Sequence, residues 1–68
     1  MNQQNAVEEK LLRLPAVIER VGFGRSWIYT EMKAGRFPKP VAVGTHRVAW
    51  RASEVQAWIG TLPREVSR

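Results

Sequence analysis

The sequence predicts one small α+β domain, mostly helical, with its elements in the order helix, helix, hairpin, helix. Three observations predict it. Apolar residues recur at helical spacing on both sides of Gly22 and again near the C-terminus, whereas Val and Trp alternate with other residues around Gly44-Thr45-His46. The length of 68 residues fits a single domain, which we bound at 10–62, with 1–9 expected as a disordered tail and 63–68 as a second tail.

The first helix is expected just before Gly22. Its apolar residues are spaced i, i+3, i+4 and i+7: Leu14, Val17, Ile18 and Val21. Pro15 suits the first helical position because its missing N–H is not needed there. Gly22 then provides a C-terminal stop.

The second helix is expected from Arg25 to Ala34, with Gly35 as its C-cap. Ile28 and Met32, four residues apart, mark its buried face. The opposite face is polar and includes Ser26, Thr30 and Lys33, with Trp27 beside it. Two short helices joined by a glycine-containing turn form a helix-turn-helix pattern.

A β-hairpin is expected next, after an extended segment containing Pro38 and Pro40. Two alternating pairs are separated by Gly44-Thr45-His46, and we expect all four to face inward: Val41, Val43, Val48 and Trp50. The tip and the return strand carry basic side chains, namely His46, Arg47 and Arg51.

The last helix is expected to begin at Ser53, because Ser53 and Gln56 fit a capping box. Its apolar stripe is again spaced i, i+3, i+4 and i+7: Val55, Trp58, Ile59 and Leu62. Gly60 and Pro63 are expected to end it. A hairpin that follows a helix-turn-helix is a wing, so the fold expected is a winged helix-turn-helix.

The positive charge is concentrated in the middle of the chain. Lys and Arg number 11 against six Glu, for a net charge of +5. Residues 20–51 hold seven of the basic residues and only Glu31 as an acid, which gives this segment a charge of +6. A concentrated basic segment is the electrostatic footprint expected for a polyanion partner.

The composition argues against other classes of protein. There is no Cys, no Asp and a single His, so disulfides, a metal cluster and a catalytic triad are not expected. No apolar run approaches the roughly 18 residues of a membrane span, and the N-terminus does not read as a signal peptide. We therefore expect a binding protein with no cofactor, no membrane partner and no enzymatic activity.

Four sequence segments resemble the AlpA family of small prophage-associated transcriptional regulators. They are LRLPAV at 12–17, VGFGRSWIY at 21–29, GRFPKPV at 35–41 and VAWRASEVQAW at 48–58. The resemblance covers 11–62 and implies a relation to winged-helix excisionases and to the DNA-binding domain of the MerR family. The family usually has Ser or another capping residue where this chain has Gly24, which weakens the case for a phosphate contact there.

Double-stranded DNA is the partner that these observations predict, with the second helix in the major groove and the wing on the minor groove or backbone. The residues expected to contact DNA are Arg25, Ser26, Trp27, Tyr29, Thr30, Lys33, Arg36, Lys39, His46 and Arg47. For Trp27 we weigh packing against the wing or the first helix against stacking on a sugar or touching a thymine methyl. Glu31 is expected on a solvated edge, and Arg51 either caps a helix or pairs with an acid such as Glu54.

The resemblance implies regulation of genes of a prophage or integrated element, in the bacterial cytoplasm and at the nucleoid. Two alternatives stay open: an excisionase-like architectural factor that bends DNA, and a phage-encoded module that binds an acidic protein. A homodimer or a cooperative assembly on DNA fits a domain of this size, and integrase or RNA polymerase are further candidate partners.

Overall fold

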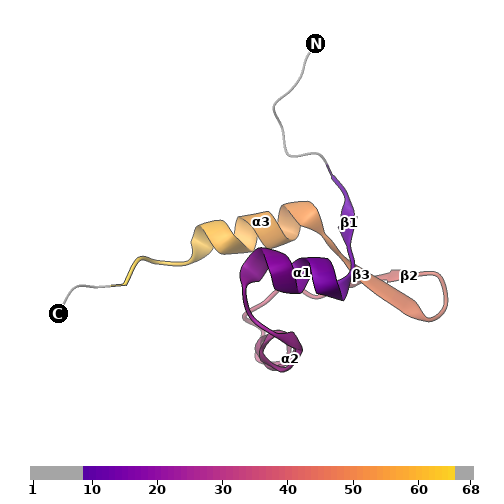
Figure 1. Ribbon diagram of the computed structural model, residues 1–68, viewed down its shortest axis with the longest axis horizontal. Helices are drawn as coiled ribbons and strands as arrows, with labels where there is room; N and C mark the ends of the chain where they lie inside the picture. Colours follow the sequence, from indigo (N-terminus) through magenta and orange to yellow (C-terminus); the bar gives the residue numbers. More distant parts are fainter. Residues whose placement is uncertain (1–8, 66–68) are drawn as a thin grey trace, which may run out of the picture.

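The computed structural model describes residues 9–65. Its elements are β1 (Leu11–Leu12), α1 (Leu14–Val21), α2 (Arg25–Lys33), β2 (Val41–Val43), β3 (Arg47–Arg51) and α3 (Ala52–Thr61). In Figure 1 α3 lies over α1, α2 lies below α1 and is seen along its axis, and the β2–β3 hairpin projects to one side. The predicted order of helices and hairpin is confirmed, with β1 as an addition. The expected tail at 1–9 lies, except for Glu9, outside the described residues.

The helix-turn-helix forms as the apolar spacing predicts. Val17 of α1 and Ile28 of α2 are fully buried and lie in the same core. Gly22 ends α1 at φ 84°, in the left-handed region that glycine adopts without strain, and its N–H donates to the Ile18 carbonyl at 2.8 Å. Gly24 is the N-cap of α2 in an extended conformation, with no side chain to cap the helix.

The end of α2 is a Schellman motif. The Gly35 N–H donates to the Met32 carbonyl at 3.0 Å, and the Arg36 N–H donates to the Glu31 carbonyl at 2.8 Å. Gly35 has φ 81°, so a glycine is favoured at this position. The predicted glycine stop is thus confirmed, although the helix itself ends one residue earlier than expected, at Lys33.

Within residues 9–65 the strands form a three-stranded antiparallel sheet in the order β1-β3-β2. Leu12 pairs with Trp50, and the Ala52 N–H donates to the Lys10 carbonyl at 2.8 Å. The sequence did not predict β1, because two residues are too few to display a strand periodicity. β1 places β3 in the centre of the sheet.

The predicted inward set of the hairpin is wrong, because its four residues do not share one face of the sheet. Val41 pairs with Ala49 and Val48 pairs with Ala42, so Val48 and Trp50, two residues apart on β3, lie on the face opposite Val41 and Val43. Val48 is 40% exposed, whereas Ala49 is buried. The physical reason is position: Val48 lies in the projecting part of β3, paired only with β2, and Trp50 lies farther along, where β1 pairs with the strand.

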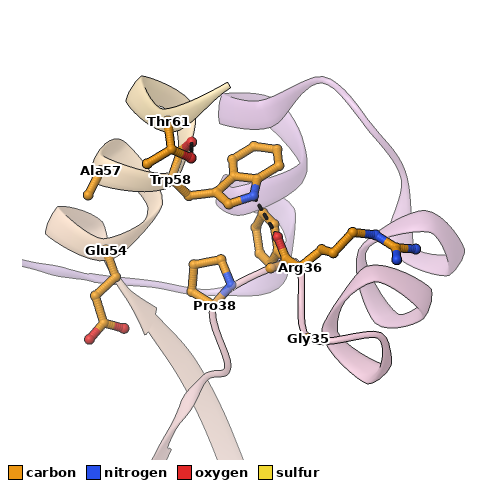
Figure 2. A pocket seen from close by; sticks show the side chains of 8 residues that line it. Gly35, Arg36, Pro38, Glu54, Ala57, Trp58 and Thr61 are labelled. Carbon is orange, nitrogen blue, oxygen red and sulfur yellow. Dashed lines mark hydrogen bonds between the residues drawn. The ribbon is translucent and has the colours of Figure 1, made fainter. Parts of the chain in front are cut away.

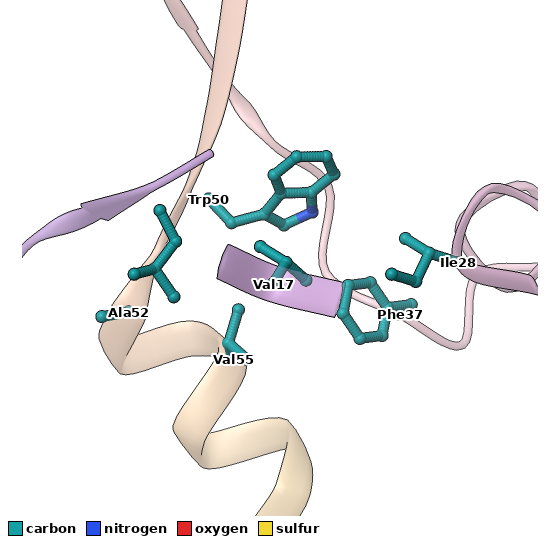
Figure 3. Packing of buried hydrophobic residues seen from close by; sticks show 7 residues of the cluster. Val17, Ile28, Phe37, Trp50, Ala52 and Val55 are labelled. Carbon is teal, nitrogen blue, oxygen red and sulfur yellow. The ribbon is translucent and has the colours of Figure 1, made fainter. Parts of the chain in front are cut away.

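The core lies where the sheet, α1, α2 and α3 meet (Figure 3). Its buried members come from every layer: Leu12, Val17, Ile28, Phe37, Trp50, Ala52 and Val55. Figure 3 shows the Trp50 ring over Val17, and Phe37 between Val17 and Ile28. The prediction that Trp50 is a core residue is confirmed, and Trp58 packs half-buried against the same cluster.

The predicted start of the last helix is wrong, and so is the predicted stop at Gly60, whereas the helix does end just before Pro63. α3 begins at Ala52, and the Ser53 hydroxyl donates to Glu9 Oε1 at 2.6 Å instead of capping the helix. Because the Ala52 N–H bonds to Lys10, the approach of β1 determines where the helix starts. The helix also continues through Gly60, whose cost in a helix is only about 1 kcal/mol, and ends before Leu62, which is 52% exposed.

Two indoles hold the segment 36–40, which connects α2 to β2. Trp58 Nε1 of α3 donates to the Arg36 carbonyl at 2.7 Å, and Trp50 Nε1 of β3 donates to the Pro38 carbonyl at 3.0 Å. The segment is therefore tied to α3 on one side and to the sheet on the other. None of the helices in residues 9–65 is long and apolar enough to cross a membrane.

Candidate nucleic-acid interface

The exposed face of α2 carries most of the predicted site residues. Ile28 directs one face of the helix into the core, and this fixes which face remains at the surface. Five predicted residues of α2 are exposed there: Arg25, Ser26, Tyr29, Thr30 and Lys33. The helical geometry thus brings these side chains to the surface as the sequence predicts.

Tyr29 lies at the centre of this surface. The residue is 39% exposed, and its ring packs edge-on against Trp50, with 6.4 Å between the ring centroids. The Arg25 guanidinium carbon lies 5.9 Å from the Tyr29 centroid, within the range of a cation–π contact. Trp50 therefore supports the Tyr29 ring from the core, and Arg25 is held close to it on the surface.

Two hollows of the described surface lie beside Tyr29. One is lined by Arg25, Ser26 and Tyr29, and the other by Tyr29, Met32, Lys33 and Lys39. The second hollow joins Lys33 of α2 to Lys39, which lies in the segment between α2 and β2. Each hollow has at least one cationic side chain on its rim, as a site for phosphate oxygens requires.

The hairpin presents His46 and Arg47 at its tip. The turn contains Gly44 at φ 71°, where glycine avoids strain, and both His46 and Arg47 are exposed. The hairpin extends away from the helices in Figure 1. Among the ion pairs of residues 9–65, none involves Lys33, Lys39 or Arg47, so these cations are available to an anionic partner.

Trp27 packs within the protein. Its ring stacks on Phe23, with centroids 4.3 Å apart and an interplanar angle of 21°. It also meets Phe37 and Trp58 edge-on at 6.5 and 6.1 Å. Its ring partners are therefore these three aromatic residues, and they do not include the hairpin that we considered from the sequence.

Arg36 is engaged by Glu31. Arg36 Nε donates to Glu31 Oε1 at 2.7 Å, and Arg36 Nη2 donates to Glu31 Oε2 at 3.2 Å. This hydrogen-bonded pairing lowers the pKa of the Glu31 carboxyl and raises the pKa of the Arg36 guanidinium. Glu31, expected on a solvated edge, is half-buried instead, because the side chain of Arg36 covers it.

The sequence analysis missed this pair, although a signal was present. A glycine at the position after a helix cap brings the following residue back over the last turn, next to the residue five positions earlier. Glu31, Gly35 and Arg36 fit that pattern. The pairing of Arg51 with Glu54, one of the alternatives considered, is confirmed at 3.6 Å.

Groups of three or more His and Glu side chains that would hold a metal ion do not occur in residues 9–65. The chemistry of the surface is instead that of hydroxyl, guanidinium and ammonium donors on a helix and a hairpin. A helix-turn-helix and a β-hairpin wing, each with exposed basic side chains, define a small winged helix-turn-helix protein.

Comparison with known proteins agrees with this class. Residues 10–64 match the sequence model of the family described as "Prophage CP4-57 regulatory protein (AlpA)". The chain belongs to this family. The expected resemblance is confirmed over almost the entire described part of the chain.

Two relatives are similar over most of this chain. An uncharacterized protein, ORF88, of Enterobacteria phage P4 is 44% identical over 52 residues, which cover 76% of this chain and 59% of that protein. The DNA-binding transcriptional activator AlpA of Escherichia coli (strain K12) is 38% identical over 65 residues, covering 87% of this chain and 90% of that protein. The chain thus spans less than two thirds of the phage relative, and no solved structure matches it.

Proposed function

We propose that this chain is a sequence-specific DNA-binding protein that regulates transcription of genes of a prophage or integrated element. The observation that carries the proposal is the set of exposed basic side chains on α2, on the segment after it and on the hairpin. A relative that is 38% identical along 90% of its length is a DNA-binding transcriptional activator, which supports the same role here.

In this proposal α2 enters the major groove of double-stranded DNA. Ser26, Thr30 and Lys33 face outward from the helix, and a helix of this kind meets base edges with distinct donor and acceptor patterns. Arg25 at the helix start reaches either a phosphate or a guanine edge. The α2 surface therefore supplies the sequence preference.

The phosphate backbone is contacted around this helix and at the hairpin. The hollow lined by Tyr29, Met32, Lys33 and Lys39 is suited to a phosphate, because two lysines and a tyrosine line it. Arg47 and His46 at the hairpin tip reach the minor groove or the adjacent backbone, where the negative potential favours a guanidinium. These contacts supply most of the affinity and fix the register of α2 on the DNA.

A single domain of this size covers only a short site. We therefore propose that copies bind as a dimer or side by side on DNA, and that integrase or RNA polymerase is contacted by the DNA-bound protein. The protein acts at the nucleoid of the bacterial cytoplasm, where its DNA target lies. No catalytic step is part of this proposal.

Selection of bound duplexes from a random pool, followed by binding titrations of the selected site at several salt concentrations, tests the proposal. With about four or five phosphate contacts, the logarithm of the binding constant should fall against that of the salt concentration with a slope near −4. A scrambled duplex of the same length is the control, and it should bind more weakly with a similar slope. A flat salt response, or equal affinity for both duplexes, would contradict sequence-specific DNA binding.

A further inference from the structure

We propose that Arg36 is a positioning residue that fixes the C-terminal turn of α2 against α3, and that DNA recognition depends on its pairing with Glu31. This inference rests on the proposed function. It assigns to Arg36 a different role from the direct DNA contact expected from the sequence.

The first support is the side-chain geometry. The two bonds from Arg36 Nε and Nη2 to the two Glu31 oxygens, at 2.7 and 3.2 Å, use both ends of the carboxylate. Such a fork-to-fork arrangement fixes orientation more strictly than a single contact between point charges. The Glu31 side chain is only 18% exposed, whereas that of Arg36 is 65% exposed, so the arginine lies over the acid.

The second support is the backbone of the same residue. The Arg36 N–H bonds to the Glu31 carbonyl at 2.8 Å, and the Arg36 carbonyl accepts the Trp58 indole N–H at 2.7 Å. Figure 2 shows this indole bond on one side of Arg36 and the side chain extending toward α2 on the other. Arg36 thus bonds α2 through its guanidinium and its N–H, and α3 through its carbonyl.

The position of the pair connects it to the proposed DNA surface. Thr30 immediately precedes Glu31, and Lys33 lies two residues after it in the same last turn of α2. A helix end that loses its side-chain and backbone restraints frays, because its last carbonyls depend on such partners. Without the Glu31–Arg36 pair, the last turn of α2 should therefore hold Thr30 and Lys33 less firmly in the positions from which they contact DNA.

The two roles of Arg36 predict different results for a charge-balanced set of variants. We would measure the ratio of affinities for the selected duplex and its scrambled control, because a change in overall charge alters both alike. The set is Glu31→Gln, Arg36→Gln and the exchanged pair Glu31→Arg with Arg36→Glu. Glu54→Gln is the matched control for Glu31→Gln. It removes the same negative charge, but from the exposed ion pair at the start of α3, where Arg51 Nη1 lies 3.6 Å from Glu54 Oε2.

A positioning role predicts that Glu31→Gln and Arg36→Gln each lower the ratio by about two- to fivefold, the range that an exposed ion pair can contribute. The exchanged pair should restore the ratio, and Glu54→Gln should leave it unchanged. Thermal unfolding of each variant shows whether it remains folded at the temperature of the titration. If Arg36→Gln fails to fold, Arg36→Lys keeps the charge but loses the two-pronged pairing, and the same drop is expected.

A direct phosphate contact predicts the opposite pattern. Arg36→Gln would then lower the magnitude of the salt slope by about 0.9. Glu31→Gln would tighten binding by releasing Arg36, and the exchanged pair would remain defective. Any of these results would overturn the positioning role, as would an unchanged ratio in both single variants. The proposed function is judged separately, since it fails only if the unaltered protein shows no preference for a selected site.

Discussion

Trp50 Nε1 donates to the Pro38 carbonyl at 3.0 Å, which joins the centre of the sheet to the segment between α2 and the hairpin. The same indole packs edge-on against the Tyr29 ring from the core, with 6.4 Å between the ring centroids. One buried side chain therefore supports both the exposed face of α2 and the connection that carries Lys39. The relative placement of the two parts of the proposed DNA surface depends on it.

We expect Trp50→Phe to lower the free energy of unfolding by about 2 kcal/mol or more. The substitution leaves the Pro38 carbonyl without its donor and opens space in the core at a fully buried position. Urea denaturation followed by far-UV circular dichroism measures the change. Trp58→Phe is the comparison: its indole bond is lost at a half-buried site, so its cost should be nearer 1 kcal/mol. A cost for Trp58→Phe equal to or above that of Trp50→Phe would contradict this ranking.

Gly22→Ala and Gly24→Ala should differ although neither added Cβ meets an atom within 4 Å. Gly22 has φ 84°, where a side chain costs roughly 1–2 kcal/mol, so its substitution should destabilise the protein by that amount. Gly24 has φ −84°, which any residue adopts, so Gly24→Ala should have a much smaller effect. Thermal unfolding of the two variants side by side checks this.

Gly24→Ser should stabilise the protein by a few tenths of a kcal/mol. Gly24 is the N-cap of α2 in an extended conformation with open space around it, and serine adds the missing acceptor for a free N–H of the first turn. A melting temperature at or below that of the unaltered protein would contradict the prediction, with Gly24→Ala as the control for the added Cβ.

The stability contribution of the Glu31–Arg36 pair should depend on pH. The folded-state pKa of Glu31 lies below its ordinary value of 4.5, so the stabilisation is fully present above that value. It is lost as the pH falls through the lowered pKa, where the carboxyl is protonated. The melting temperature of Glu31→Gln should therefore lie below that of the unaltered protein near neutral pH, and the difference should vanish in stronger acid. A difference that stays constant as the pH is lowered progressively below 4.5 would contradict the pairing.

The sequence correctly predicted the burial or exposure of residues whose position is set by local helix geometry. Helical spacing placed Ile28 in the core, and the opposite face of α2 is exposed as a consequence. The errors at Val48 and Ser53 have other causes. The error at Val48 comes from the register of β2 and β3, whereas the start of α3 before Ser53 depends on β1, because Leu12 pairs with Trp50 and the Lys10 carbonyl binds the Ala52 N–H. A partner that lies some 40 residues away along the chain leaves no trace in local periodicity.

The candidate site likewise contains residues that local spacing predicts and features that only tertiary packing determines. The exposed residues of α2 were predictable from a helical wheel. The hollow that joins Lys33 to Lys39 could not be predicted in this way, because it depends on the course of the segment between α2 and β2. Two prolines make that segment extended, but the indole bonds from Trp50 and Trp58 determine where it runs. The side chains of Trp27 and Arg36 could not be placed from spacing alone, because their partners come from tertiary packing and from the turn at Gly35.

The last prediction separates base recognition from phosphate contact on the DNA surface. Thr30→Ala and Lys33→Ala should each reduce the preference for the selected site over a scrambled duplex, because both side chains face outward from α2. Lys39→Ala should weaken binding to both duplexes alike and lower the magnitude of the salt slope by about 0.9, because it removes one phosphate contact. Arg64→Ala is the matched control: it also removes one positive charge, but from the segment after α3, outside the residues proposed to contact DNA. Arg64→Ala should therefore change the affinities for both duplexes less than Lys39→Ala does. If Thr30→Ala, Lys33→Ala and Lys39→Ala all bind a mapped site as the unaltered protein does, α2 is not the DNA-reading helix.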